Sequence, residues 1–271
     1  MSVIEISHLT RDYGNGKGIY DVSFDVNEGE VFGFLGPNGA GKTTTIRHLM
    51  GFINAEKGTC KINGLDCMND RETIQKDLGY LAGEIALFDE MTGDEYLRFV
   101  SSYCGEKASK RKNDLIERFE LDGSVRIKKM SKGMKQKIGI IAAFMHDPKI
   151  LILDEPTSGL DPLMQQRFVS LIKEERERGK TILMSSHIFE EVEKTCDRVG
   201  LIREGKMSDI SSIESLRAEH SRKYRVTLEN AEEARLFAND FSGKADGREV
   251  VLEKLQTLEE IFLKYYGEDE R

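Results

Sequence analysis

The chain has 271 residues, 39% of them hydrophobic, which is enough for a large domain with a sizeable core and an appendage. Its net charge of −8 argues against a nucleic-acid-binding surface, so we expect no nucleic-acid partner. No stretch approaches the roughly 20 apolar residues of a membrane helix, and the start lacks a signal-peptide pattern. The four cysteines show no metal-ligand spacing and predict free thiols. We therefore expect a cytoplasmic protein that reaches a membrane only through a partner.

Strand-like and helical patterns alternate along most of the chain. Short apolar runs bounded by glycine and segments of alternating apolar and polar residues indicate strands, whereas longer amphipathic stretches indicate helices. The predicted strands are 3–6, 22–26, 31–35, a pair within 58–65, 149–153 and 181–185; the predicted helices are 43–50 and several within 92–144, where Thr92 is the expected first N-cap. This alternation predicts an α/β fold with a largely parallel sheet.

The character of the chain changes near residue 207. Beyond it, segments 224–228 and 249–252 have the pattern of strands, and 257–266 has the pattern of an amphipathic helix. We therefore expect a large domain over 1–207 and a small C-terminal accessory domain over 208–271.

Residues 36–43 read Gly-Pro-Asn-Gly-Ala-Gly-Lys-Thr and fill every fixed position of the G-x-x-x-x-G-K-[ST] template. Glycines let a backbone approach a phosphate chain closely, and a helix that begins near Lys42 presents unpaired N–H groups and its positive dipole end. Lys42 adds a charge at the β- and γ-phosphates, and Thr43 offers a hydroxyl to Mg²⁺. A chance match is disfavoured because a buried strand precedes the loop and a helix follows. The expected nucleotide-binding residues are Gly36, Asn38, Gly39, Ala40, Gly41, Lys42, Thr43 and Thr44.

A second element, 150–155, is an apolar strand that ends in two carboxylates. In enzymes with such a phosphate loop, an acid at a strand end holds Mg²⁺, and we expect this role for Asp154. Glu155 points elsewhere and could polarise the attacking water. Alone, such a strand end could be coincidental; beside the phosphate loop it predicts hydrolysis of a nucleoside triphosphate.

Together with three further segments, these elements resemble the nucleotide-binding subunits of ATP-binding-cassette (ABC) transporters over residues 1–207. Segment 154–161 resembles the family's magnesium and dimer-contact segment, 184–187 its switch-histidine segment and 130–134 its signature. Tyr13 lies where an aromatic residue stacks on adenine. The resemblance implies a P-loop NTPase fold with a mostly parallel sheet, an N-terminal antiparallel β subdomain, an inserted helical subdomain at about 84–145 and a small C-terminal α+β appendage.

The resemblance also implies a mechanism that uses ATP and Mg²⁺. Two copies close face to face around two ATP molecules, each held between the phosphate loop of one copy and the signature of the other. Ser131 and the Gly133 N–H would meet the γ-phosphate, and Asp161 would bridge the homodimer. Glu155 would act as general base, and His187 would hold the γ-phosphate and the water. The implied catalytic residues are Lys42, Glu155 and His187.

The sequence departs from the family pattern in two places. In the signature, Lys132 replaces a glycine and Met134 replaces a glutamine, so we expect Lys132 to add positive charge near the phosphates or the partner copy. In the loop where the family carries a glutamine that senses Mg²⁺, this chain has Gly83 followed by Glu84. Glu84 is either a substitute metal ligand or a surface carboxylate.

The tail resembles subunits that serve exporters of antibiotics, antimicrobial peptides, sodium or cell-surface polymers, with a separately encoded membrane permease. The implied location is the inner face of the cell membrane, through that permease. The alternative is a non-transport ABC-type ATPase in translation, repair or regulation. Translation factors carry two such cassettes, and repair proteins carry long coiled coils where this chain has room only for a helical subdomain. A regulatory module without turnover is disfavoured because Glu155 and His187 are both present.

Overall fold

The computed structural model describes residues 1–104, 107–219, 221–241, 243–255 and 260. By its internal contacts the chain forms two compact units, Met1–Ile210 and Ser211–Arg271, which are described separately. The predicted terminal helix at 257–266 lies outside the described residues, apart from Glu260.

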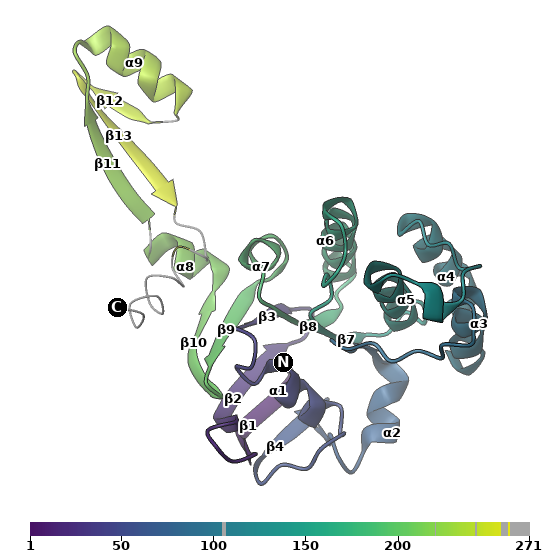
Figure 1. The fold of residues 1–271 in the computed structure, drawn as a ribbon. Coiled ribbons are helices and arrows are strands. Elements are labelled where there is room, and N and C mark those ends of the chain that lie inside the picture. Colours follow the sequence, from purple (N-terminus) through teal and green to yellow (C-terminus); the bar gives the residue numbers. More distant parts are fainter. Residues whose placement is uncertain (105–106, 220, 242, 256–259, 261–271) are drawn as a thin grey trace. The chain divides into compact units, whose positions relative to one another are not determined.

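A six-stranded sheet with the order β10-β9-β3-β8-β7-β6 forms the centre of the first unit (Figure 1). The chain pairs β6 with β7, β7 with β8, β8 with β3 and β3 with β9, all in parallel. β3 and β7 are buried at every position, as expected for strands covered on both faces. The strands are β3 (Val31–Leu35), β6 (Leu78–Leu81), β7 (Ile150–Asp154), β8 (Thr181–Ser186), β9 (Arg198–Arg203) and β10 (Lys206–Ser212).

A second, antiparallel sheet has the order β2-β1-β4-β5. It comprises β1 (Ser2–Asp12), β2 (Gly18–Asn27), β4 (Lys57–Ile62) and β5 (Leu65–Asp66). Helix α1 (Lys42–Leu49) contacts β2 and β4 of this sheet and β7 of the central sheet. One hydrophobic core therefore joins both sheets and α1, through side chains such as Ile4, Phe24, Phe34, Ile46 and Ile152.

The predicted helical segment at 92–144 forms three α-helices, which Figure 1 shows gathered beside α6. Thr92 caps the first as predicted: its hydroxyl accepts from the Glu95 N–H at 3.2 Å, and the Glu95 carboxylate accepts from the Thr92 N–H at 2.8 Å. The helices of this unit are α2 (Arg71–Ile74), α3 (Gly93–Cys104), α4 (Lys107–Arg118), α5 (Lys132–Phe144), α6 (Pro162–Glu177) and α7 (Phe189–Thr195), with 3-10 turns η1 (Gln75–Asp77) and η2 (Ile127–Lys129).

Ion pairs around a buried carboxylate tie α4 to α6. Glu175 of α6 is 2% exposed, and its carboxylate pairs with Arg111 of α4, with Arg178 and, at 2.6 Å, with Lys180. Burial by itself would raise the pKa of Glu175, but hydrogen bonds from Lys180 and Arg111 outweigh burial, and the pKa is lowered. Asp147 pairs with the same three cations. The position of α4 therefore depends on charge as well as on apolar packing.

The second unit contains a three-stranded antiparallel sheet with the order β11-β13-β12. Helix α9 packs on β12 and β13, and the small core consists of Ala234, Ala238 and Val250. Asn230 caps α9 by accepting from the Glu233 N–H at 2.9 Å. The elements of the second unit are α8 (Ile213–Glu219), β11 (Ser221–Thr227), α9 (Ala231–Asp240), β12 (Lys244–Asp246) and β13 (Glu249–Leu255).

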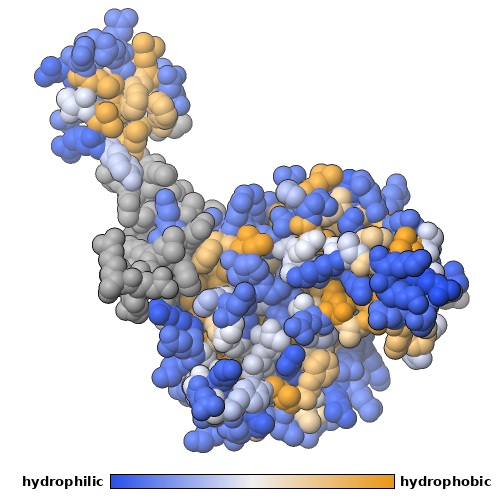
Figure 2. Space-filling view, viewed as in Figure 1, coloured by the Kyte–Doolittle hydropathy of each residue, from blue (hydrophilic) through white to orange (hydrophobic). Residues whose placement is uncertain are grey.

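The molecular surface is mostly hydrophilic on the face that Figure 2 shows, with apolar patches on both units. Exposed aromatic residues in the first unit include Phe52, Phe88 and Tyr103. Over the described part of the chain, no helix combines the length and the apolar character that crossing a bilayer requires.

Candidate nucleotide-binding site

The phosphate loop lies between β3 and α1, as its sequence predicts. Gly41, at the N-cap position of α1, has a φ of 109°, and no side chain caps the helix. A Cβ at this position would lie 2.6 Å from Cγ2 of Ile19, so only glycine fits both the dihedral and the space. The first turn of α1 therefore presents backbone N–H groups that no described side chain caps, which is the chemistry of an anion site.

Lys42 is almost completely buried beneath this loop, with 5% of its surface exposed. Its ammonium donates to the carbonyl oxygens of Gly36 at 2.6 Å and Pro37 at 3.2 Å. The same nitrogen lies 3.1 Å from Oε1 of Glu155. The loop thus holds a buried ammonium group beside the carboxylate that follows β7. Because this place is largely removed from water, a phosphate would interact strongly with the ammonium group.

Asp154 and Thr43, the two residues expected to hold Mg²⁺, lie in direct contact. The Thr43 hydroxyl donates to Oδ2 of Asp154 at 2.7 Å, and the Ser185 hydroxyl donates to Oδ1 at 2.5 Å. Asp154 is completely buried. A hydroxyl and a carboxylate are oxygen ligands that suit Mg²⁺. Among the described residues no group of three or more His, Cys, Asp or Glu could hold a metal.

Ser185 is a member of this site that the sequence did not single out. It is the β8 residue that lies opposite Asp154 in the parallel register. Its hydroxyl also accepts from the Glu155 N–H at 3.0 Å, so one side chain fixes both acidic residues. The sequence feature that could have identified Ser185 is its position in segment 184–187, at the end of a buried strand.

Glu155 turns away from Asp154, and its carboxylate lies between the Lys42 ammonium and the His187 imidazole. Its backbone has a φ of 49°, in the left-handed region that residues other than glycine seldom adopt. One carboxylate oxygen faces Lys42, and the other is hydrogen-bonded to Nδ1 of His187. His187 follows β8 and is half-exposed. The structure therefore brings together the three residues expected to be catalytic.

Two open cavities meet at this point. One, of about 460 Å³, is lined by Tyr13, Asn38, Gly39, Ala40, Gly41, Lys42, Thr43, Thr44 and Glu155 among others. Tyr13 is half-exposed, and the Arg11 guanidinium lies 5.4 Å from the centre of its ring. The second cavity, of about 420 Å³, includes Asn38, Thr43, Glu84, Lys132, Glu155 and His187.

Gly83 lies against the acidic residue of the metal site. A Cβ at Gly83 would be 3.1 Å from Oδ2 of Asp154. Tyr80 lines the same cavity, and burial and then the charge of Asp154 raise its pKa to about 12. Glu84 lines the cavity and is exposed. Gly83 therefore lies in close contact with the Asp154 carboxylate, and a side chain at this position would displace one of the two.

The signature segment lies at the start of α5. Ser131 is the N-cap of α5 and accepts from the Met134 N–H at 3.2 Å. Lys132 donates to the Ser158 hydroxyl at 2.8 Å. Asp161 is the N-cap of α6 and accepts from the Met164 N–H at 3.0 Å. Lys132 and Ser158 line the second cavity, whereas Ser131, Gly133 and Asp161 line neither cavity.

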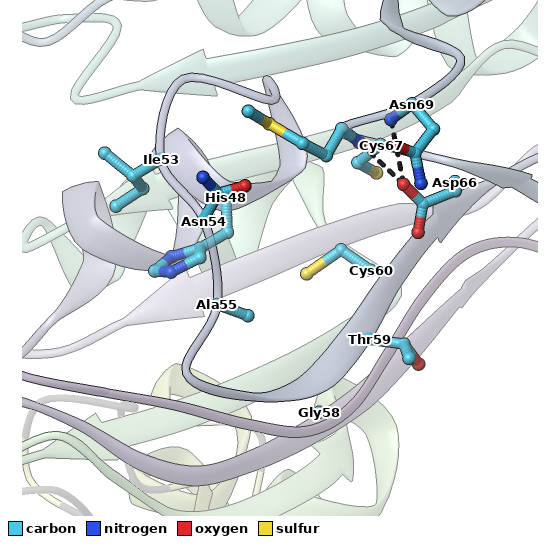
Figure 3. Close-up of a pocket in the computed structure, with 11 residues that line it drawn as sticks. His48, Ile53, Asn54, Ala55, Gly58, Thr59, Cys60, Asp66, Cys67 and Asn69 are labelled. Carbon is cyan, nitrogen blue, oxygen red and sulfur yellow. Dashed lines mark hydrogen bonds between the residues drawn. The ribbon is translucent and has the colours of Figure 1, made fainter.

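A separate pocket of about 220 Å³ contains His48, Cys60 and Cys67 (Figure 3). Burial raises the pKa of Cys60 to about 12 and raises that of Cys67 further, so both thiols stay protonated at neutral pH. Burial lowers the pKa of His48, which keeps its imidazole neutral. All four cysteines of the chain are free, as predicted. Asp66 also lines this pocket, but no lysine or arginine of the described residues does, so the pocket has no cation like Lys42 of the phosphate-loop site.

Comparison with known proteins supports the resemblance to ABC transporter ATP-binding subunits. The family model described as "ABC transporter" matches residues 19–158. The chain is 35% identical, over 93% of its length and 85% of the relative's, to the uncharacterised ABC transporter ATP-binding protein YhcH of Bacillus subtilis. It is 36% identical, over 82% of its length and 74% of the relative's, to the bacitracin transport ATP-binding protein BcrA of Bacillus licheniformis.

Among solved structures, one described as an ATP-binding subunit of an ABC transporter is similar. It superposes with a TM-score of 0.73 at 32% sequence identity and covers 80% of this chain and 93% of that one. This likeness, with the parallel central sheet, confirms the predicted fold class.

Proposed function

The chain belongs to the family of ABC transporter ATP-binding proteins and is an ABC-type ATPase, and from this premise we propose that two copies close around two Mg·ATP to drive export. The observation that carries the proposal is the position of Glu155. Its carboxylate lies between Lys42 and His187. The preceding residue, Asp154, accepts a hydrogen bond from Thr43 of the phosphate loop. An acid held beside a phosphate cradle in this way is suited to activate water.

In the proposed mechanism the first turn of α1 and Lys42 bind the β- and γ-phosphates, and Tyr13 stacks on the adenine. Thr43 and Asp154 would hold Mg²⁺, with Glu84 as a further candidate, and the metal would neutralise phosphate charge. Glu155 takes a proton from water, while His187 orients the carboxylate and the γ-phosphate. Ser131 and the Gly133 N–H of the second copy close the site from the opposite side, and Asp161 bridges the two copies.

We further propose that residues 1–207 are the nucleotide-binding domain, with a helical subdomain at about 84–145, and that 208–271 form an accessory domain. The partner would be a separately encoded membrane permease, which would hold the ATPase at the inner face of the cell membrane. A relative named for bacitracin transport supports a role in transport. That Ser131 and Asp161 line neither cavity of their own chain supports a site that two copies complete.

Glu155→Gln tests this function because it keeps the shape of the side chain and removes the base. We expect ATP turnover to fall about 10²- to 10⁴-fold, and the variant to accumulate as an ATP-bound dimer in size-exclusion chromatography. Glu117→Gln, an exposed change on α4, is the matched control and should behave as the parent. Near-parental hydrolysis by Glu155→Gln would remove Glu155 from the mechanism.

A further inference from the structure

Gln136 is a buried polar residue in the second turn of α5, and none of the roles described above uses it. It is 2% exposed. Its side-chain Nε2 donates to the carbonyl oxygen of Pro156 at 2.8 Å and to that of Glu155 at 3.3 Å. Both partners are acceptors, so the amide must present its NH₂ group to them. The side chain therefore joins α5 to the backbone of the proposed general base.

The backbone that Gln136 holds is unusual at this point. Glu155 has a φ of 49°, a left-handed conformation that residues with a Cβ seldom adopt. On the β-sheet side, the Glu155 N–H donates to the Ser185 carbonyl at 3.2 Å and the Ser185 hydroxyl at 3.0 Å. On the other side, the carbonyl of Glu155 accepts from Gln136 and from the Ser158 N–H. Such a conformation persists only where its surroundings determine it from both sides.

From these contacts we infer that Gln136 is a positioning residue for ATP hydrolysis: it fixes the backbone of Glu155 so that the carboxylate keeps its place beside Lys42 and His187. The inference rests on the function proposed above, in which Glu155 activates water. Gln136 itself lines neither cavity and acts only through the peptide groups that it holds.

Two neighbours on α5 hold the rest of the same segment. Lys132 donates to the Ser158 hydroxyl at 2.8 Å. At Gly133 a Cβ would lie 2.6 Å from the carbonyl oxygen of Gly159, so α5 and the segment are in close contact there. The helix that carries the Ser131 cap therefore contacts residues 155, 156, 158 and 159 of its own chain. In the proposed dimer, a displacement of α5 by the second copy's nucleotide would move Glu155 through Gln136.

The test compares two substitutions at Gln136 in the full chain. Gln136→Met keeps the volume and removes the donor. We expect its kcat to fall about 10- to 100-fold, as for a misplacement of a catalytic group, with a less than about two-fold change in the dissociation constant of a non-hydrolysable Mg·ATP analogue. Gln75→Met, an exposed change on η1, is the matched control and should leave both quantities unchanged.

Gln136→Glu gives a readout that mere loss of packing would not give. A carboxyl here faces two carbonyl oxygens in a buried place, so its protonated form is favoured and its pKa is raised. Only the protonated form donates. We therefore expect the kcat of this variant, relative to the parent, to rise about ten-fold as pH falls from about 8 to about 6, whereas the ratio for Gln136→Met stays flat.

The outcomes separate this inference from the proposed function. A parent that hydrolyses ATP, with Glu155→Gln inactive and Gln136→Met at parental kcat, overturns the role of Gln136 alone. A pH-independent ratio for Gln136→Glu overturns it too, because the donor would then be irrelevant. Full activity of Glu155→Gln overturns the proposed function, and the role of Gln136 with it.

Discussion

Two helices of the first unit, α1 and α5, begin at glycine-containing segments, yet their first turns are built differently. The start of α1 has no side-chain cap, and Gly41 adopts a left-handed φ that frees the following N–H groups. The start of α5 is capped by the Ser131 hydroxyl, which accepts from the Met134 N–H. No described side chain caps the first helix start, whereas in the second the Ser131 hydroxyl already accepts from one N–H.

The elements that pack against the two helices also differ. α1 packs between two sheets within one apolar core, which fixes the phosphate loop. α5 packs on α3, on α4 and on β6, and α4 is tied to α6 by the ion pairs around Glu175. The comparison teaches that the proposed phosphate site lies at the start of a helix held by one apolar core that both sheets share. The signature segment lies on a helix with a buried apolar face, next to α4, which is held by ion pairs as well as by apolar packing.

The largest expected effect on this comparison comes from Glu175→Gln. Removing the buried carboxylate leaves Lys180 and Arg111 with Asp147 as their remaining acidic partner, and we expect the free energy of unfolding at pH 7 to fall by about 3 kcal/mol. This is the low end of the usual range because Asp147 remains. Glu174→Gln, on the adjacent and more exposed residue, is the control and should cost less than about 1 kcal/mol.

The stabilisation that the Glu175 carboxylate gives to the folded state should decrease in acid. The folded pKa of Glu175 is lowered, so its stabilisation is fully present above the unfolded value, about 4.3. The stabilisation is lost as pH falls through the folded pKa. In urea titrations the difference between parent and Glu175→Gln should be constant near neutrality and shrink below about pH 4. A difference that grows in acid would contradict the ion-pair account.

A smaller effect is expected from Ser131→Ala at the start of α5. Loss of an N-cap lowers the free energy of unfolding by about 1 kcal/mol, measurable by thermal or urea unfolding. Because α1 has no such cap, this change should leave the affinity for Mg·ATP intact while lowering turnover. Ser170→Ala, an exposed serine on α6, is the control. A loss of Mg·ATP affinity in Ser131→Ala would show that the two helix starts are not separate.

The sequence was sufficient where local pattern and chemistry coincide. The strand 31–35, the glycine-rich loop and the helix after it lie as predicted, because a glycine-bounded apolar run and a phosphate-binding template leave few alternatives. Thr92 was predicted as an N-cap and is one, since its partner Glu95 lies three residues along the chain. Such features depend on contacts within a few residues.

Contacts between distant segments were not predictable in the same way. Ser185 holds Asp154 because β7 and β8 pair in a particular register, which no local pattern reveals. Gln136 stands beside an apolar run, but the sequence alone does not say that it meets the carbonyls of residues 155 and 156. Lys132 was expected near the phosphates or the partner copy; its side chain lines the second cavity and donates to Ser158. These details depend on tertiary packing.

The most direct measurement is a titration of the purified chain with Mg·ATP, alongside Lys42→Ala and Gly41→Ala. Lys42→Ala removes the buried cation, and Gly41→Ala adds a Cβ that strains the loop and meets Ile19. We expect saturable binding by the parent and about 10- to 100-fold weaker binding by each variant, which corresponds to a loss of roughly 1.4–2.8 kcal/mol. Equal affinity in all three proteins, or none in the parent, would contradict a phosphate site at the start of α1.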